Sequence, residues 1–208
     1  MPPLELLLSF VILVLSLSFH EAAHAFTADR LGDPTARLLG RLTLNPIAHI
    51  DLVGTVLFPL LGMATGLPLI GWAKPVPVNM RNLRRPRQDF ALVALAGPVS
   101  NVILAVCASI LLMIFRTATH TAALAPSALG EALLMGVVIN VLLAVFNMLP
   151  VPPLDGGNVL MGVVSEPVAR TIAWLRPYGF LVLYALMLLG IIDKLLIPVQ
   201  HAVLSWLL

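Results

Sequence analysis

Apolar residues along the chain are gathered into long segments that shorter polar segments separate. Four of the apolar segments carry few charges over the roughly 20 residues that a helix needs to cross a bilayer. We predict spanning helices at residues 4–28, 90–115, 131–149 and 172–190. The last apolar segment, 195–207, is short for a span, so it either crosses or lies at the membrane interface.

One further apolar segment, residues 51–70, differs from the others because glycines and prolines interrupt it. Hydropathy alone predicts a span here. The interrupting residues are Gly54, Pro59, Gly62, Gly66 and Pro68.

The polar segments carry weaker structural signals. Within residues 29–50, the run 36–44 alternates loosely between apolar and polar positions, which is compatible with a short β hairpin near the cytoplasmic face. Residues 71–89 are basic and rich in proline, which predicts an extended loop. Residues 158–170 have the pattern of a short interfacial helix.

The composition is that of a membrane protein. The chain is 60% hydrophobic and 11% charged, with a mean hydropathy of +1.01, whereas a soluble domain has about 25% charged residues. We expect an all-α polytopic protein in which residues 1–208 form a single intramembrane domain within the lipid bilayer. The basic residues gather in loops, so they are topology signals and do not indicate nucleic-acid binding.

The first predicted helix contains the motif His-Glu-Xaa-Xaa-His. His20 and His24 are one helical turn apart and share a face, so both imidazoles can reach one metal ion. Glu21 lies beside them, where its carboxylate can act on water. The motif is typical of zinc metalloproteases, and ionisable residues inside a membrane helix are usually functional. The competing interpretation is that the histidines are polar residues packed between helices.

Catalytic zinc usually has three protein ligands, so the two histidines need a partner from elsewhere in the chain. No histidine follows within residues 25–30, and the others lie in loops or near the C-terminus: His49, His120 and His201. Asp155 is the best candidate, because it follows three prolines in four residues and precedes two glycines that allow a sharp turn. The competing interpretation is an ordinary turn, since Asp-Gly is a common turn signal.

The position of Asp155 constrains the topology. If this carboxylate meets the histidines, helices 4–28 and 131–149 must end at the same membrane face. With helix 90–115 as a full span, that requires segment 51–70 to enter and leave on one side. We therefore predict that 51–70 is re-entrant and covered by protein.

The distribution of charge gives the orientation. Segments 29–50 and 71–89 hold eight of the twelve Lys and Arg residues, which places both segments in the cytoplasm by the positive-inside rule. We expect a multi-pass protein of the cell membrane whose active site opens toward the cytoplasm.

Three stretches of the sequence resemble the signatures of the site-2 protease family of intramembrane zinc metalloproteases. They are His20-Glu21-Ala22-Ala23-His24, Ala96-Gly97-Pro98-Val99-Ser100-Asn101 and Asn147-Met148-Leu149-Pro150-Val151-Pro152-Pro153-Leu154-Asp155-Gly156. Residues 45–51 and 71–79 also look like blocks of its compact bacterial members. The resemblance implies one Zn²⁺ per chain, bound by His20, His24 and Asp155, with Glu21 as the catalytic base.

The resemblance also implies the substrate class. It points to an endopeptidase that cuts in or near transmembrane segments of membrane-anchored proteins, as in regulated intramembrane proteolysis. Asn147 is implied to hold the substrate backbone or the oxyanion, and Asn101 is a second candidate for contact with the site. The PDZ or CBS domain that family members often carry is not expected in this chain.

Two other functions fit the same residues. In a metal transporter or channel, the His20, Glu21, His24 and Asp155 cluster would bind a passing ion. An inactive relative would bind transmembrane helices without cutting them, although the intact Glu21 and the three candidate ligands argue against it.

Overall fold

The computed structural model describes residues 3–58, 61–62, 71–119 and 127–208. Its elements in chain order are α1 (Pro3–Leu31), α2 (Thr35–Leu38), η1 (Pro46–Ala48), η2 (Leu52–Leu57), η3 (Met80–Asn82), α4 (Pro86–Ala118), α5 (Ala128–Asn147), α6 (Asp155–Val163), α7 (Glu166–Leu175), η4 (Arg176–Tyr178), α8 (Gly179–Leu188) and α9 (Ile191–Leu207). None of the described residues forms a strand.

Four helical stretches in the described residues are long and apolar enough to cross a membrane. They are Glu5–Leu31, Pro86–Ala118, Ala128–Asn147 and Glu166–Leu188. The prediction of an all-α polytopic membrane protein is therefore confirmed. The helix α9 has 17 residues and is not among the four.

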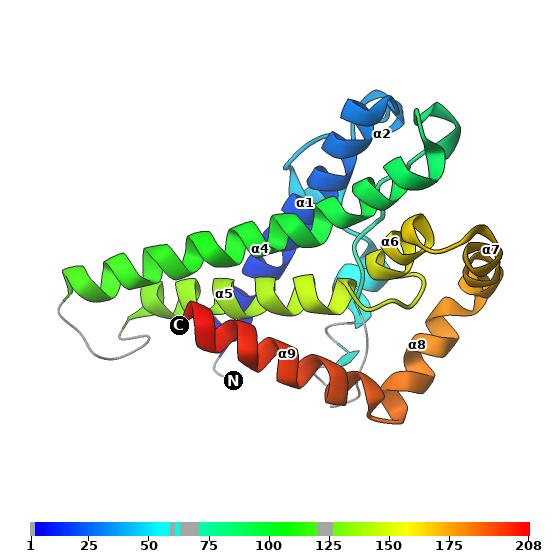
Figure 1. The fold of residues 1–208 in the computed structure, drawn as a ribbon. Helices are drawn as coiled ribbons and strands as arrows, with labels where there is room; N and C mark the ends of the chain where they lie inside the picture. The colour runs from blue at the N-terminus through cyan, green and yellow to red at the C-terminus, as the bar shows by residue number, and fades with distance from the viewer. Residues whose placement is uncertain (1–2, 59–60, 63–70, 120–126) are drawn as a thin grey trace.

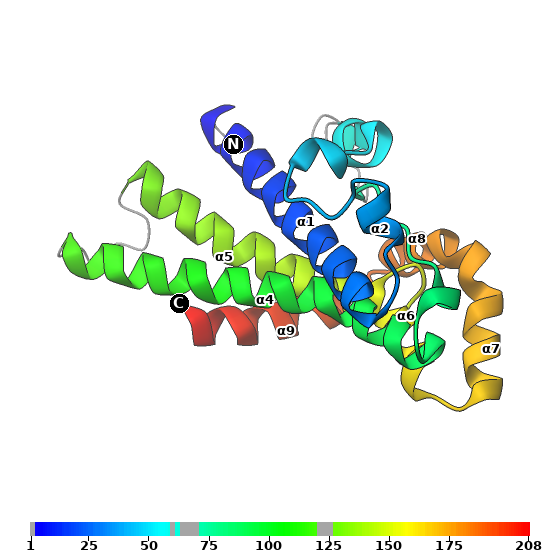
Figure 2. The ribbon, with the colours of Figure 1, turned by 90° about the horizontal axis from the view of Figure 1, so that it is seen from above.

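The helices α1, α4 and α5 form the body that carries the site. Figures 1 and 2 show α5 running alongside α4, while α1 crosses the N-terminal half of α4 and α9 lies along α5. The C-terminal ends of α1 and α5 and the N-terminal end of α4 lie on the same side of this body (Figure 1). Residues on three segments far apart in the sequence therefore meet near that side.

Local signals set the ends of the long helices. The Ser127 hydroxyl accepts a hydrogen bond from the Gly130 backbone N–H and caps the start of α5. The carboxylate of Asp89 accepts from the Arg85 N–H at 2.8 Å at the start of α4. Prolines at 150, 152 and 153 prevent α5 from continuing beyond Asn147.

The helices keep apolar side chains on their outer faces as well as inside. Ala105, Val137 and Val141 form a buried cluster between α4 and α5. Ile103 and Met113 on α4 are 57% and 64% exposed, although both are strongly hydrophobic. Such faces suit hydrocarbon and not water, in agreement with insertion into a bilayer.

The short β hairpin expected at residues 36–44 does not form. These residues make the short helix α2 followed by turns, and residues 71–79 are extended without strand pairing. A side chain provides the link between the two segments, because Arg41 Nη2 donates to the Lys74 carbonyl oxygen at 2.7 Å. The loose alternation at 36–44 therefore reflects half-exposed turns.

Half of the expected re-entrant segment 51–70, namely 59–60 and 63–70, lies outside the described residues. Its two ends, however, lie against each other. The Trp72 N–H donates to the Gly54 carbonyl oxygen at 3.0 Å, and the Thr55 hydroxyl donates to the Trp72 carbonyl oxygen at 2.8 Å. Trp72 therefore lies beside Gly54 and Thr55, although 16 residues separate Thr55 from Trp72 in the sequence.

The expected interfacial helix at 158–170 is divided in two. The helix α6 ends at Val163, and Val164 and Ser165 are extended. The next helix, α7, starts at Glu166 with Pro167 in its first turn, a position that proline favours.

Asp33 ties the end of α1 to the loop that precedes α4. Its Oδ2 accepts from the Asn79 N–H at 2.6 Å, and its Oδ1 accepts from Asn82 Nδ2 at 2.8 Å and from the Thr35 backbone N–H at 3.2 Å. Burial would raise the pKa of Asp33, but hydrogen bonds from the Thr35 hydroxyl, the Asn82 side chain and the two backbone N–H groups outweigh burial and lower the pKa below its ordinary value of 3.8. Asp33 therefore holds residues 71–82 in place over α1.

We expect Asp33→Ala to lower the free energy of unfolding by about 1–3 kcal/mol, because it removes several partly buried hydrogen bonds to a charged acceptor. Asp33→Asn, which keeps one oxygen, should lose less. Since the pKa is lowered in the folded protein, the stabilisation is complete at neutral pH and is lost as the pH falls below 3.8. Thermal unfolding in detergent between pH 3 and 7 measures the effect, and an Ala variant as stable as the parent at pH 7 would contradict it.

Candidate metal centre

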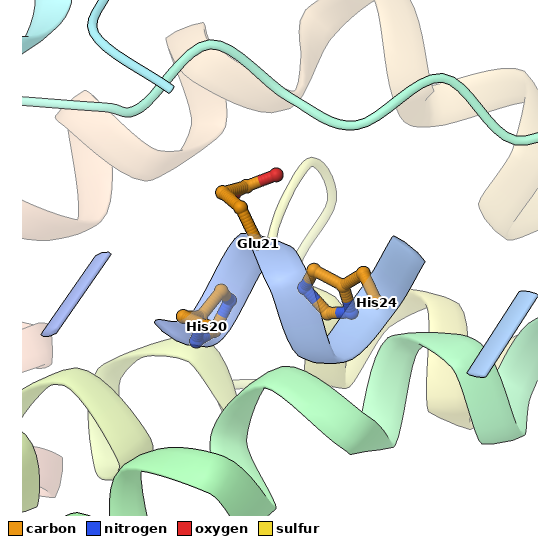
Figure 3. A group of neighbouring side chains, drawn as sticks. All are labelled: His20, Glu21 and His24. Carbon is orange, nitrogen blue, oxygen red and sulfur yellow. The ribbon is translucent and has the colours of Figure 1, made fainter. Parts of the chain in front are cut away.

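The helix α1 presents its three chemically active residues on two faces. His20 and His24 point toward α4, whereas Glu21 points toward the extended segment on the opposite side (Figure 3). All three are buried, with 4% to 8% of their surface exposed. One candidate ligand atom from each residue lies within 4.8 Å of the others.

Asp155 completes the cluster from a distant part of the chain. Its Oδ2 lies 3.0 Å from His20 Nε2 and 3.4 Å from His24 Nε2. This oxygen is buried and makes no hydrogen bond within the described residues. Two imidazole nitrogens and one carboxylate oxygen therefore converge on a common point.

The spacing of these three atoms suits a zinc ion. Two ligand atoms at about 2.0–2.1 Å from a tetrahedral zinc ion lie about 3.3 Å apart, and the two Nε2–Oδ2 distances lie on either side of that value. Imidazole and carboxylate are both common zinc ligands, and an oxygen without a hydrogen-bond partner is what a cation would satisfy. The residues present fit the metal.

The proline break after α5 brings Asp155 to the histidines. Two glycines follow it, and both lie too close to the preceding chain for a side chain. A Cβ on Gly156 would lie 2.3 Å from the Met148 carbonyl oxygen, and one on Gly157 would lie 2.8 Å from the Pro152 nitrogen. The helix α6 can therefore start directly against the end of α5, with Asp155 as its first residue.

Asp155 supplies a carboxylate group to the cluster, and its Oδ2 faces both imidazoles. The cluster thus offers a cation one negative charge beside two nitrogen ligands.

The ring nitrogens that face away from Asp155 are also bound. His20 Nδ1 lies 2.6 Å from Asn101 Oδ1, and His24 Nδ1 lies 2.7 Å from the Val93 carbonyl oxygen. Both partners are acceptors here, so each Nδ1 carries a proton, and Nε2 is the ring nitrogen left for a metal ion. Histidines that ligate zinc are typically held in this way.

Gly97 allows α4 to pass directly beneath the imidazoles. A Cβ on Gly97 would lie 2.5 Å from both His20 Nε2 and His24 Nε2. Glycine is the one residue without a Cβ, so the space that the two Nε2 atoms face exists because position 97 lacks a side chain.

A backbone amide holds the carboxylate of Glu21. The Val76 N–H donates to Glu21 Oε2 at 2.8 Å. Val76 belongs to the segment that Asp33 anchors, and this segment passes over the outer face of α1 (Figure 3). Glu21 is therefore fixed beside the cluster by a different element from those that fix the histidines.

A cavity of about 420 Å³ opens onto the cluster. Its lining includes the four clustered residues and Asn147. Asn147 Nδ2 donates to the Leu143 carbonyl oxygen within its own helix at 2.9 Å, so its expected contact with substrate stays a prediction. Trp72 and Phe180 also line the cavity, and their rings pack against each other with centroids 5.6 Å apart.

The other predicted residues lie elsewhere. Asn101 does not line this cavity, and its carboxamide holds the rear of His20. The geometry therefore favours a positioning role for Asn101 over contact with substrate. His49 is buried away from the cavity and lies 2.8 Å from the Thr43 carbonyl oxygen through Nε2.

Sequence reasoning missed three partners of the cluster: the Val93 carbonyl, the Val76 N–H and the side chain of Asn140, which hydrogen-bonds to Asn101. The two backbone partners carry no sequence signal, since every residue supplies a carbonyl group and every residue except proline supplies an N–H. Asn140 did carry a sequence signal, because a carboxamide within an apolar membrane helix is costly unless it has hydrogen-bond partners.

Comparison with known proteins gives a consistent result. Residues 112–189 match the model of Peptidase family M50. The chain is 38% identical over 202 residues to the "Putative zinc metalloprotease YwhC" of Bacillus subtilis (strain 168), and the match covers 96% of this chain and 89% of that protein. No solved structure matches the chain.

Two further relatives carry similar names. The "Putative zinc metalloprotease Rip2" of Mycolicibacterium smegmatis is 31% identical over 196 residues, which cover 92% of this chain and 72% of that protein. The "Putative zinc metalloprotease MJ0611" of Methanocaldococcus jannaschii is 46% identical over 68 residues, 33% of this chain and 31% of that protein.

Proposed function

The chain belongs to Peptidase family M50, the site-2 protease family of zinc metalloproteases, and from this premise we propose that it cleaves transmembrane segments of membrane-anchored proteins. The observation that carries the proposal is the convergence of His20, His24 and Asp155 on one point, with Glu21 beside them and a cavity in front. In this proposal the enzyme acts in regulated intramembrane proteolysis.

The proposal assigns zinc ligation to His20, His24 and Asp155. A bound zinc ion supplies a Lewis acid that polarises the scissile carbonyl group and acidifies water. Asn101 and the Val93 carbonyl hold the imidazoles so that both Nε2 atoms face the metal position. Asp155 contributes the negative charge that offsets part of the charge of the cation.

Glu21 is the proposed general base and acid. It is next to His20 in sequence but lies on a different face of α1, so its carboxylate is free for proton transfer. Oε2 accepts from the Val76 N–H, and no described residue donates to Oε1, which leaves that oxygen for proton transfer. Glu21 takes a proton from the attacking water and delivers it to the leaving amine.

The substrate is proposed to enter the cavity as an unwound stretch of a transmembrane helix. An intact helix satisfies its own amides, so its carbonyl groups become accessible only where the helix opens. Asn147 is placed to hydrogen-bond such an opened backbone or the developing oxyanion, because it lines the cavity beside Asp155. Peptide hydrolysis also needs water, which the open side of the cavity admits.

The site is proposed to open toward the cytoplasm from the cell membrane. His24 lies about 10 Å from the end of α1 at 1.5 Å per residue, and the basic segments 29–50 and 71–89 lie at that end. The hydrogen bond between the Trp72 N–H and the Gly54 carbonyl supports the re-entrant course of 51–70 that this topology needs.

We expect purified protein to contain one zinc ion per chain and to cleave a model transmembrane substrate in proteoliposomes. A chelator should stop cleavage, and added zinc should restore it. Loss of a hydrogen bond to a zinc ligand usually lowers zinc affinity by about 10–100-fold. Asp155→Ala removes a ligand itself, so it should lower zinc affinity by more than that. The measurement is metal content by mass spectrometry beside cleavage on gels.

Asp193→Ala, which removes an exposed carboxylate far along the chain, is the control and should keep its zinc. Parent protein that binds no zinc would overturn the proposal. Zinc flux into the liposomes without cleavage would favour the metal transporter instead.

A further inference from the structure

A line of buried polar side chains runs from His20 across the interface of α1, α4 and α5. Behind His20 lies Asn101 on α4, and behind Asn101 lies Asn140 on α5. Ser16, one turn before His20 on α1, closes the line. Asn101, Asn140 and Ser16 are 0%, 4% and 3% exposed, so water does not compete for their hydrogen bonds.

The contacts in this line are short. Asn101 Oδ1 lies 2.6 Å from His20 Nδ1, and Asn101 Nδ2 donates to Asn140 Oδ1 at 2.9 Å. Asn140 Nδ2 donates to the Gly136 carbonyl oxygen at 2.8 Å and to Ser16 Oγ at 3.0 Å. Asn101 Nδ2 also lies 3.4 Å from the Ser16 carbonyl oxygen, a longer contact.

The direction of every hydrogen bond in the line follows from one backbone group. The Gly136 carbonyl oxygen can only accept, so the group of Asn140 that faces it must be the NH₂. The oxygen of Asn140 then faces Asn101 and accepts from the NH₂ of that residue. The oxygen of Asn101 is left for His20, and because it can only accept, His20 must carry its proton on Nδ1.

We propose that Asn140 is a positioning residue that acts through Asn101 to fix the His20 tautomer, with Nε2 unprotonated and aimed at the metal. This inference rests on the proposed function, because it takes His20 as a zinc ligand. His24 reaches the same state by a shorter route, since its Nδ1 contacts the Val93 carbonyl directly. Each ligand histidine is thus set by a backbone carbonyl, one directly and one through two carboxamides.

A purely structural role would be to join α1 to α5, as polar side chains often do between membrane helices. The two roles depend on different contacts. The joining role needs the bond between Asn140 and Ser16 Oγ, whereas the orienting role needs the bonds from Asn140 to Gly136 and Asn101. Ser16→Ala removes the first contact and leaves the other two.

The first test needs no substitution in the line. Nitrogen-15 NMR of histidine-labelled, zinc-loaded protein in lipid bilayers reports which ring nitrogen of each histidine carries the proton and which one binds the metal. The His20 signal is assigned by its loss in His20→Gln. We expect the Nδ1-protonated form, and observation of the Nε2-protonated form in folded protein would overturn the proposal.

The second test compares three variants by zinc affinity, measured by competition with a chromophoric chelator. We expect Asn140→Leu to lower zinc affinity by about 10–100-fold, the usual effect of removing a partner behind a zinc ligand. Ser16→Ala should stay within about threefold of the parent. Ser9→Ala removes a different α1–α5 contact, from Ser9 Oγ to Met135 Sδ at 3.3 Å, and should have no effect.

The visible spectrum of the cobalt-substituted protein adds a readout that helix joining alone would not move. It should change in Asn140→Leu, because the geometry at His20 changes, and stay the same in Ser16→Ala. Equal zinc affinity in Asn140→Leu and the parent, or an equal loss in Ser16→Ala and Asn140→Leu, overturns the positioning role. If Asn140→Leu does not fold, the NMR experiment on the parent decides.

The outcomes separate this proposal from the proposed function. A parent protein that fails to bind zinc or to cleave refutes the protease assignment. A parent that does both, with an Asn140→Leu variant that binds zinc equally well, refutes only the role of Asn140.

Discussion

Glu21→Gln is expected to reduce cleavage of a transmembrane substrate by about 10²–10⁴-fold or more while the zinc content stays at that of the parent. The three atoms that converge on the metal position come from His20, His24 and Asp155, and none belongs to Glu21. Glutamine has nearly the same size, and its oxygen can still accept from the Val76 N–H. What it lacks is the ability to take a proton from water.

Cleavage and zinc content should be measured on the same preparations in proteoliposomes. Glu5→Gln makes the same chemical change in the first turn of α1, far from the cluster, and should cleave at the parent rate. Undiminished cleavage by Glu21→Gln would remove the residue from the mechanism. Loss of zinc together with cleavage would make it a ligand.

Gly97→Ala is expected to abolish zinc binding and, with it, cleavage. The added methyl carbon would lie 2.5 Å from both Nε2 atoms, a distance at which something must move. Neither imidazole can retreat easily, because His20 is held by Asn101 and His24 by the Val93 carbonyl. Either α4 must therefore shift away from α1, or the two imidazoles must turn so that their Nε2 atoms no longer face one metal position.

The matched control is Val99→Ile, which also adds one carbon to α4 but on a face that is 44% exposed. It should keep parent levels of zinc and activity. Metal content and thermal unfolding should be recorded for both variants. A Gly97→Ala protein that binds zinc at parent affinity would mean that the clash is relieved by a small shift of α4.

Local sequence signals were sufficient for part of the site. The spacing of His20 and His24 fixes their shared face in any helix, and the prolines before Asp155 end α5 where the motif predicts. These features depend on a few neighbouring residues. The order of the apolar segments likewise predicted the long helices, which the structure extends by a few residues at α1 and α4.

Other features depend on contacts between distant segments, and the sequence alone could not supply them. Asn101 was a second candidate for contact with the site, and its carboxamide lies behind His20, a position that no pattern in the sequence indicates. The β hairpin was expected from alternation at 36–44, but a hairpin needs a partner strand at the right distance. Here hydrogen bonds from Asn79 and Asn82 to Asp33 draw the chain into another path.

The amide that holds Glu21 lies in an unusual stretch of chain. Pro75 and Pro77 flank Val76, and proline has no N–H, so residues 75–77 possess a single backbone donor. That donor is already engaged by the carboxylate. An incoming peptide strand that lies along residues 75–77 therefore meets only carbonyl oxygens, so its own N–H groups must make the hydrogen bonds to this stretch.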